Sequence, residues 1–88
     1  MQTIYVISVY NTEDKDIEEI ECYSDLTKAI TFAKQYFLNN YEITNEDNNL
    51  LEKKFKSLKQ SVENKGYGTV NDLLDAYDVS VYKRKLNI

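Results

Sequence analysis

The sequence predicts an α+β domain, in which a three-stranded antiparallel or mixed sheet carries helices packed mainly on one face. Two observations support this fold class. Runs of β-branched and aromatic residues lie near both ends of the chain. Between them, apolar residues recur at the three- and four-residue spacing of amphipathic helices. The predicted order is ββαααβ, as a single domain over residues 1–88.

The first predicted strand is TIYVISVY, residues 3–10. Its side chains alternate between two faces, with Val6 on one face and Ile7 and Val9 on the other. Both faces are largely apolar, which indicates a central strand with cover on each side.

A polar turn leads to a second predicted strand at residues 17–23, where alternation predicts that Ile20 and Cys22 face inward. The side chains predicted to face outward are Glu19, Glu21 and Tyr23. This pattern is typical of a hairpin partner with one face in water. We expect this strand at a sheet edge if the last strand pairs with the first, because charged residues discourage unwanted edge pairing.

The first helix is predicted to begin after Ser24, a favourable N-cap, with Asp25 in its first turn. Asn39 and Asn40 are residues that commonly end a helix. Its buried stripe consists of apolar residues at helical spacing: Leu26, Ala29, Ile30, Ala33 and Phe37. Phe32 and Tyr36 widen the stripe on one flank.

The second helix is predicted to follow a cap-like cluster at residues 44–47 and to end at Lys65 and Gly66. Its apolar residues are spaced by four, three and four positions: Leu51, Phe55, Leu58 and Val62. Thr69 is then predicted to cap a short third helix that runs through Tyr77.

The last predicted strand contains Val79 and Val81, which alternate with Ser80 and Tyr82. It ends in the cationic residues 83–85. The sequence leaves open whether this strand lies beside the first strand or the second. Pairing with the first strand fits the polarity best, because it makes the most apolar strand central.

The composition excludes most catalytic chemistry. The chain has no histidine, so Ser-His-Asp, Cys-His and histidine-rich metal arrangements cannot form. Gly66 and Gly68, its only glycines, indicate a helix end followed by a new cap and cannot form a phosphate-binding loop. Cys22 follows Glu21 and has no neighbouring cation in sequence, which predicts a buried structural thiol. We therefore expect no enzyme, no cofactor and no metal site.

Charge is divided unevenly along the chain, whose net charge is -4. Most of the negative charge lies in the first half, and the segment NTEDKDIEEIE is the densest part. Like charges at this density favour a surface that binds a cationic partner, although a solvated hairpin would also produce the pattern. The candidate partner-binding residues are the acidic side chains and the two flanking tyrosines: Tyr10, Glu13, Asp14, Asp16, Glu18, Glu19, Glu21 and Tyr23.

The expected location is the cytoplasm, because the chain has one cysteine, no signal-peptide pattern and no long apolar run. Its acidic charge disfavours anionic membranes and direct nucleic-acid binding, so we expect a protein partner with a basic surface. A homodimer also stays open.

The order of elements and the run YSDLTKAITFAKQYF resemble small uncharacterised proteins of phages and mobile elements in low-GC bacteria, over about residues 3–40. The resemblance implies a cytoplasmic location in the host cell and action without catalysis, as in anti-CRISPR and other anti-defence proteins. With the acidic segment, it leads us to expect a non-enzymatic inhibitor of a host or competitor protein, such as a defence nuclease. Two alternatives stay open: an immunity or antitoxin protein that covers a basic toxin cleft, and a self-assembling structural protein.

Overall fold

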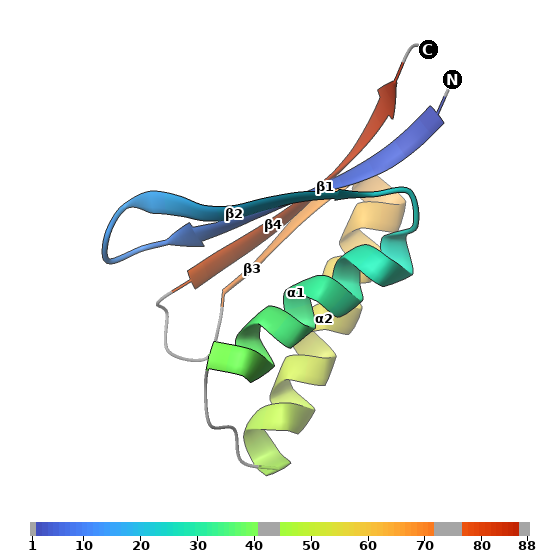
Figure 1. The fold of residues 1–88 in the computed structure, drawn as a ribbon. Coiled ribbons are helices and arrows are strands. Elements are labelled where there is room, and N and C mark those ends of the chain that lie inside the picture. Colours follow the sequence, from blue (N-terminus) through green and yellow to red (C-terminus); the bar gives the residue numbers. More distant parts are fainter. Residues whose placement is uncertain (1, 41–44, 72–76, 87–88) are drawn as a thin grey trace.

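The computed structural model describes residues 2–40, 45–71 and 77–86. Four strands form one antiparallel sheet in the order β2-β1-β4-β3, and two helices lie against one of its faces (Figure 1). The described elements follow the order ββααββ. The α+β fold with helices on one face is confirmed, whereas the prediction of three strands in the order ββαααβ is wrong.

Two long strands, β1 (Gln2–Asn11) and β4 (Tyr77–Leu86), form the centre of the sheet. They pair along their whole length, from Gln2 opposite Leu86 to Asn11 opposite Tyr77. The last strand therefore lies beside the first, as the polarity of the two strands favoured. β2 (Asp16–Tyr23) is an edge strand, as expected for this arrangement.

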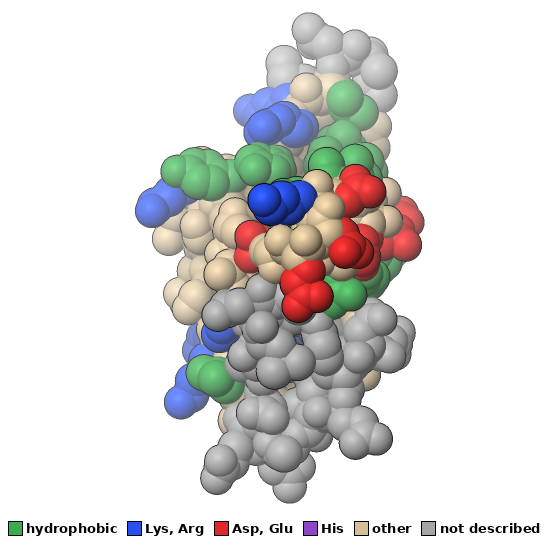
Figure 2. Space-filling model, turned by 90° about the vertical axis from the view of Figure 1, so that its left-hand side faces the viewer, with side chains coloured by type: hydrophobic (Ala, Val, Ile, Leu, Met, Phe, Trp, Pro, Cys, Tyr) green, Lys and Arg blue, Asp and Glu red, His purple; other side chains and the backbone are tan. Residues whose placement is uncertain are grey.

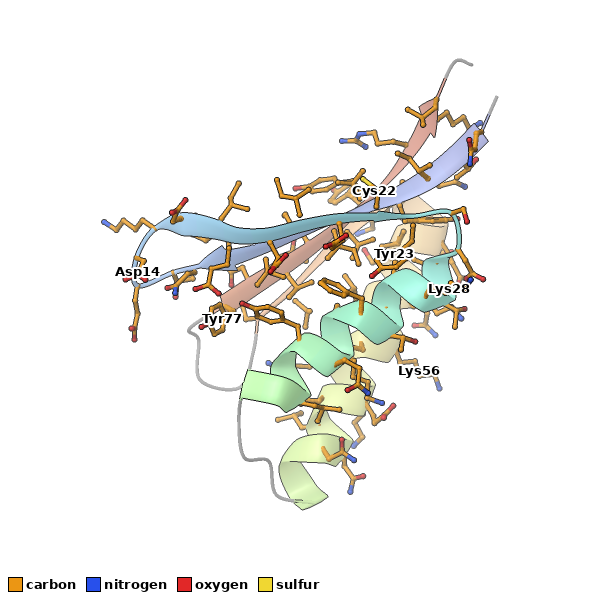
Figure 3. All side chains as sticks on the ribbon, viewed as in Figure 1. Asp14, Cys22, Tyr23, Lys28, Lys56 and Tyr77 are labelled. Atoms are coloured by element: carbon orange, nitrogen blue, oxygen red, sulfur yellow. The ribbon has the colours of Figure 1, made fainter. Side chains whose placement is uncertain are left out.

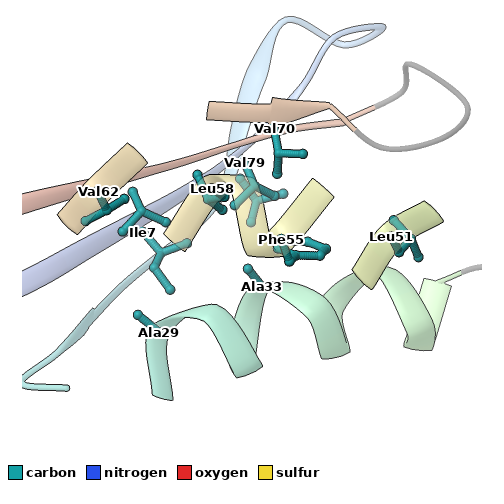
Figure 4. Packing of buried hydrophobic residues seen from close by; sticks show 11 residues of the cluster. Ile7, Ala29, Ala33, Leu51, Phe55, Leu58, Val62, Val70 and Val79 are labelled. Carbon is teal, nitrogen blue, oxygen red and sulfur yellow. The ribbon is translucent and has the colours of Figure 1, made fainter. Parts of the chain in front are cut away.

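The core lies between this central pair and the helices. Ile7, Val9, Val79 and Val81 alternate along β1 and β4 and are 0% exposed. Their side chains all point toward the helices because alternate residues of a strand share one face. Figure 4 shows this cluster packed against buried side chains of both helices.

Helix α1 (Leu26–Asn40) begins one residue later than predicted. The Asp25 Oδ1 atom accepts a hydrogen bond from the Thr27 backbone N–H at 2.7 Å, so Asp25 caps the helix in place of Ser24. Ala29 and Ala33 of the predicted stripe are buried against the sheet. The predicted burial of Phe37 lies outside the described side chains.

Helix α2 (Asn45–Lys65) confirms the predicted apolar stripe, whose four residues are at most 3% exposed: Leu51, Phe55, Leu58 and Val62. It ends where predicted, because Gly66 adopts a φ of 85° and its N–H donates to the Val62 carbonyl at 2.9 Å. The Thr44 part of the predicted cap cluster lies outside the described residues.

β3 (Tyr67–Asn71) replaces the start of the predicted third helix. Thr69 pairs with Ser80 of β4 and therefore does not cap a helix. Gly68 is needed for packing: a Cβ atom at this position would lie 2.8 Å from the Leu58 Cδ1 atom. The second glycine thus lets β3 approach α2 closely, and it does not begin a new helix. The rest of the predicted third helix, residues 72–76, lies outside the described residues.

β2 presents the opposite face from the one predicted. Its pairing with β1 sets Cys22 opposite Val6 and Ile20 opposite Ser8, on the side of the sheet away from the helices. Figure 3 shows Cys22 on that side and Tyr23 on the helix side. Cys22 is exposed, so the prediction of a buried thiol is wrong.

A β-bulge between Val9 and Tyr10 gives β2 one extra residue, Glu18. In a regular strand, Ile17 and Ile20 would point to opposite faces because they are three residues apart. Because of the bulge, Ile17 pairs with Tyr10 and Ile20 pairs with Ser8, so both isoleucines lie on the side of the sheet away from the helices. Glu18 and Glu19 lie on the helix side. We call the side of the sheet away from the helices the open face. Its main apolar members are Val6, Tyr10, Ile17, Ile20, Tyr67 and Tyr82.

Within the described ranges, neither helix is long and apolar enough to cross a bilayer.

Candidate functional site: an acidic surface along the edge strand

Six carboxylates lie along β2 and the turn before it. Figure 2 shows acidic side chains, in red, gathered on one side of the molecule. We call this group the acidic surface; all of its residues are exposed: Glu13, Asp14, Asp16, Glu18, Glu19 and Glu21. In the described part of the chain, none of them forms an ion pair, and the Lys34–Glu52 pair joins the two helices elsewhere. The negative charge of this surface is therefore left for solvent or for a partner.

Asn11 organises the turn that carries the first carboxylates. Its Oδ1 atom accepts hydrogen bonds from the backbone N–H groups of Glu13 and Asp14, both at 3.0 Å. Its Nδ2 atom donates to the Asp14 carboxylate at 3.4 Å. Asn11 is 9% exposed, and Lys15 at the tip adopts a φ of 54°, which a tight turn requires. These hydrogen bonds therefore hold the turn, and the carboxylates on it, in a defined conformation.

Glu18, the bulge residue, connects this turn to helix α1. Its Oε1 atom accepts from the Asn11 Nδ2 atom at 2.9 Å, and its Oε2 atom accepts from the Tyr36 hydroxyl. These hydrogen bonds, from Tyr36 first and then Asn11, lower the pKa of Glu18. Burial and the neighbouring Glu18 carboxylate raise the pKa of Tyr36. Glu18 is thus held ionised at one fixed place.

A row of aromatic rings borders the carboxylates on the helix side. The ring centroids of Tyr23 and Phe32 are 5.8 Å apart, and those of Phe32 and Tyr36 are 6.5 Å apart. The Tyr36 and Tyr77 rings meet edge to face, with their centroids 5.8 Å apart. Figure 3 shows Tyr23 and Tyr77 on the side of the sheet that faces α1. Tyr23, Phe32 and residues of α1 also line a shallow depression on the surface. Carboxylates and ring faces therefore share one surface.

The structure brings together seven of the eight predicted partner-binding residues. Tyr23 joins the six carboxylates, because it lies on the helix side of β2 next to Phe32. Tyr10 does not join them: it lies opposite Ile17 and Asp78, on the open face. Sequence reasoning also missed Phe32 and Tyr36 as members of this site, since their spacing within α1 shows only that they flank its apolar stripe.

The arrangement offers negative charge and aromatic ring faces on one surface. Among the described residues, no group of three or more His, Cys, Asp or Glu side chains is placed to hold a metal ion. The exposed Cys22 thiol lies on the open face, away from the carboxylates.

Comparisons with protein-family models, curated proteins and solved structures found no match for this chain.

Proposed function

We propose that this chain is a non-enzymatic protein-binding module that inhibits a host or competitor protein, such as a defence nuclease, by covering a basic surface on it. One observation carries the proposal: six exposed carboxylates lie together with no ion pair among the described residues. The resemblance of residues 3–40 to small phage and mobile-element proteins stays a prediction, and it would imply the same role.

The acidic surface suits Arg and Lys side chains of a partner. Glu19 and Glu21 are exposed on the helix side of β2, the side that also carries Tyr23. A guanidinium group can hydrogen-bond a carboxylate while it stacks on an aromatic face, and each contact strengthens when water is excluded. Asn11 and Tyr36 hold Glu18 in advance, so less side-chain freedom is lost on binding.

This mode of recognition predicts fast association that is sensitive to salt, because separated charges are screened beyond about 8 Å at physiological ionic strength. The net charge of -4 acts in the same direction as the local surface. A partner selected by apolar contact would show little salt dependence.

The test uses the wild-type chain and a variant with Glu13→Lys, Asp14→Lys and Asp16→Lys as paired baits in a bacterial lysate. We expect the wild type to capture a specific protein at low salt, and the variant to lose it. For the purified partner, the association rate constant should fall by at least about tenfold in the variant. Capture of no specific protein at low or moderate salt, or equal capture by both baits, would contradict the proposal.

A matched pair of single changes separates location from total charge. Glu19→Lys and Glu63→Lys alter the net charge equally, and both residues are exposed. Only Glu19 belongs to the acidic surface, since Glu63 lies on α2. We expect Glu19→Lys to weaken binding strongly and Glu63→Lys to weaken it slightly.

Self-assembly is a second candidate, favoured by a groove between α1 and α2 that is lined by Lys53, Lys56 and Lys59 together with the Lys34–Glu52 ion pair. The acidic surface of one copy could dock in this groove of another. Such association should weaken as salt is added. Sedimentation at several salt concentrations tests it, and a monomer at low salt would contradict it.

A further inference from the structure

The open face is an apolar sheet surface that no described element covers. Both helices lie on the other face of the sheet (Figure 1). Ile17, Ile20 and Tyr67 of the open face are 51%, 57% and 54% exposed. An antiparallel sheet can leave one face in water, but such a face is normally polar. Large contiguous apolar patches usually mark interaction sites.

The strand register arranges this face in rows. One row crosses all four strands and is apolar throughout, from Cys22 through Val6 and Tyr82 to Tyr67. The next row toward the hairpin is smaller and flatter, with Ser8 and Ser80 at its centre and Ile20 at its edge. Larger side chains thus alternate with the small Ser8 and Ser80 along β1 and β4.

Among the described residues of the four paired strands, the open face carries charge only on β4, at Asp78 and Arg84. They lie six residues apart, which is about 20 Å along a strand. Arg84 lies over the ring of Tyr82, 5.0 Å from its centroid. The face therefore carries opposite charges at its two ends and no net charge of its own.

We propose that the open faces of two copies of this chain pack against each other around a two-fold axis that runs across the strands at the level of Val81. This axis exchanges positions 78 and 84, so Arg84 of each copy lies against Asp78 of the other. It also exchanges positions 80 and 82, so the Tyr82 ring of each copy meets the small Ser80 of the other. Aligned packing of two twisted antiparallel sheets is a common arrangement.

The charges select this axis over the alternative. A two-fold axis parallel to the strands would exchange β4 with β1 and place Arg84 over Ile4, its neighbour in the sheet. That arrangement covers Arg84 and Asp78 without partners, which is strongly unfavourable. Only the axis across the strands pairs both charges.

The size of the face suits a weak, reversible dimer. Between levels 78 and 84, β1 and β4 span seven residues each, β2 spans six levels and β3 spans five. With strands about 4.8 Å apart and residues about 3.4 Å apart, the flat footprint is about 400 Å² per copy. Two copies would bury about 800 Å² by this measure, below the usual range for stable complexes. Four carboxylates of the acidic surface lie on the helix side of β2, away from this interface: Asp16, Glu18, Glu19 and Glu21. The dimer does not depend on the proposed function, because it uses the other face of β2.

Sedimentation velocity from about 1 µM to about 1 mM tests the proposal, since interfaces of this size have dissociation constants in the micromolar range or weaker. We expect a concentration-dependent dimer that persists at high salt, unlike an assembly through the lysine groove. Ile20→Lys should raise the dissociation constant at least about a hundredfold, because it places a charge in an apolar contact. Its matched control is Gln60→Lys, which adds the same charge at an exposed position of α2, on the other side of the sheet, and should change the constant little.

The charge pair gives the sharper test. Asp78→Arg or Arg84→Asp alone should weaken the dimer at least about tenfold, and the double variant should recover most of the loss. In the wild-type chain, Cys22 should react with a thiol reagent more slowly as protein concentration rises, because it lies on the open face. A wild-type monomer at about 1 mM, an unchanged Ile20→Lys dimer, or a double variant without recovery would overturn the proposal. A monomer would instead indicate that the open face binds a different protein.

Discussion

The two sides of the helix layer are held to the sheet by different interactions. On the side of β3 and β4, α2 contributes Leu51, Phe55, Leu58 and Val62, which are at most 3% exposed. On the side of β2, α1 contributes the small residues Ala29 and Ala33 to the core, and its outer rings meet an exposed strand of carboxylates. Burial of large apolar side chains dominates the first side, and hydrogen bonds and ring contacts dominate the second.

This difference separates stability from recognition. Apolar burial contributes about 25 cal/mol per Å², so the α2 side should carry most of the folding free energy. The β2 side keeps polar groups near water, where they can exchange solvent for a partner at little cost to the fold. Changes on the α2 side should act on stability, and changes on the β2 side should act on binding.

The largest expected effect is that of Phe55→Ala on the α2 side. Phe55 is 2% exposed, so its removal leaves a cavity and should cost about 3–5 kcal/mol of unfolding free energy. The matched change on the β2 side is Phe32→Ala, where the ring is only partly buried and the loss should be less than half as large. Chemical denaturation of both variants measures this, and equal losses would contradict the division into two sides.

Gly68→Ala should have the next largest effect, about 1–3 kcal/mol, because the added Cβ atom meets the Leu58 side chain at 2.8 Å. A change of Leu58 to Val should relieve part of this overlap. The loss in the double variant should therefore be smaller than the sum of the two single losses. Additive losses in thermal or chemical unfolding would show that β3 can move away from α2 freely.

On the β2 side, Asn11→Ala should cost about 1–2 kcal/mol, since it removes a nearly buried amide that accepts from two backbone N–H groups. Hydrogen exchange of the Glu13 and Asp14 amides should accelerate. Asn49→Ala, at an exposed position of α2, is the control and should change stability by less than about 0.5 kcal/mol. Unchanged exchange in the Asn11 variant would mean that the turn is ordered by other contacts.

The smallest effect concerns pH. Because the pKa of Glu18 is lowered, its contribution to stability is present above the ordinary value of 4.5 and is lost as pH falls through the lowered pKa. Tyr36→Phe removes the hydrogen bond that lowers the pKa of Glu18 most, so this pKa should rise toward 4.5. The remaining hydrogen bond from Asn11 should still keep the pKa below that value. Carboxyl titration by NMR measures the shift. An unchanged pKa in the variant would show that the Tyr36 hydroxyl does not bind Glu18 in solution.

The sequence correctly predicts the elements whose hydrophobic pattern depends on contact with a single neighbouring element. Leu51, Phe55, Leu58 and Val62 form one stripe against one sheet, so their spacing alone indicates which side is buried. The prediction that β1 is a central strand is confirmed, but the prediction that both of its faces are covered is wrong, because both described helices lie on one face of the sheet. Apolar side chains on both faces of a strand do not show whether another element covers each face.

β2 was predicted with the wrong face because alternation identifies two faces without saying which one meets the helices. The usual assumption buries Ile20 and exposes Glu19, but here the open face is apolar and the edge of the helix side is wet. The bulge at Glu18 depends on the pairing with β1 and leaves no mark in the local pattern.

β3 and the aromatic part of the site were missed for a related reason. Gly68 is explained by the approach of Leu58, which comes from a distant part of the chain. The hydrogen bond from Tyr36 to Glu18 likewise joins residues 18 positions apart, through the pairing of α1 with β2. Contacts of this kind depend on the tertiary structure and cannot be predicted from one local segment.

The pairing of Gln2 with Leu86 has a consequence for how the chain folds. The central strands of the sheet come from opposite ends of the described chain, so a nascent polypeptide cannot form its core until β4 has left the ribosome. Until then, β1 has only the β2 hairpin beside it, and the apolar side chains of both its faces are open to other chains. Folding dominated by such distant pairing is slow, which makes the interval after synthesis the period when this protein is most prone to aggregate.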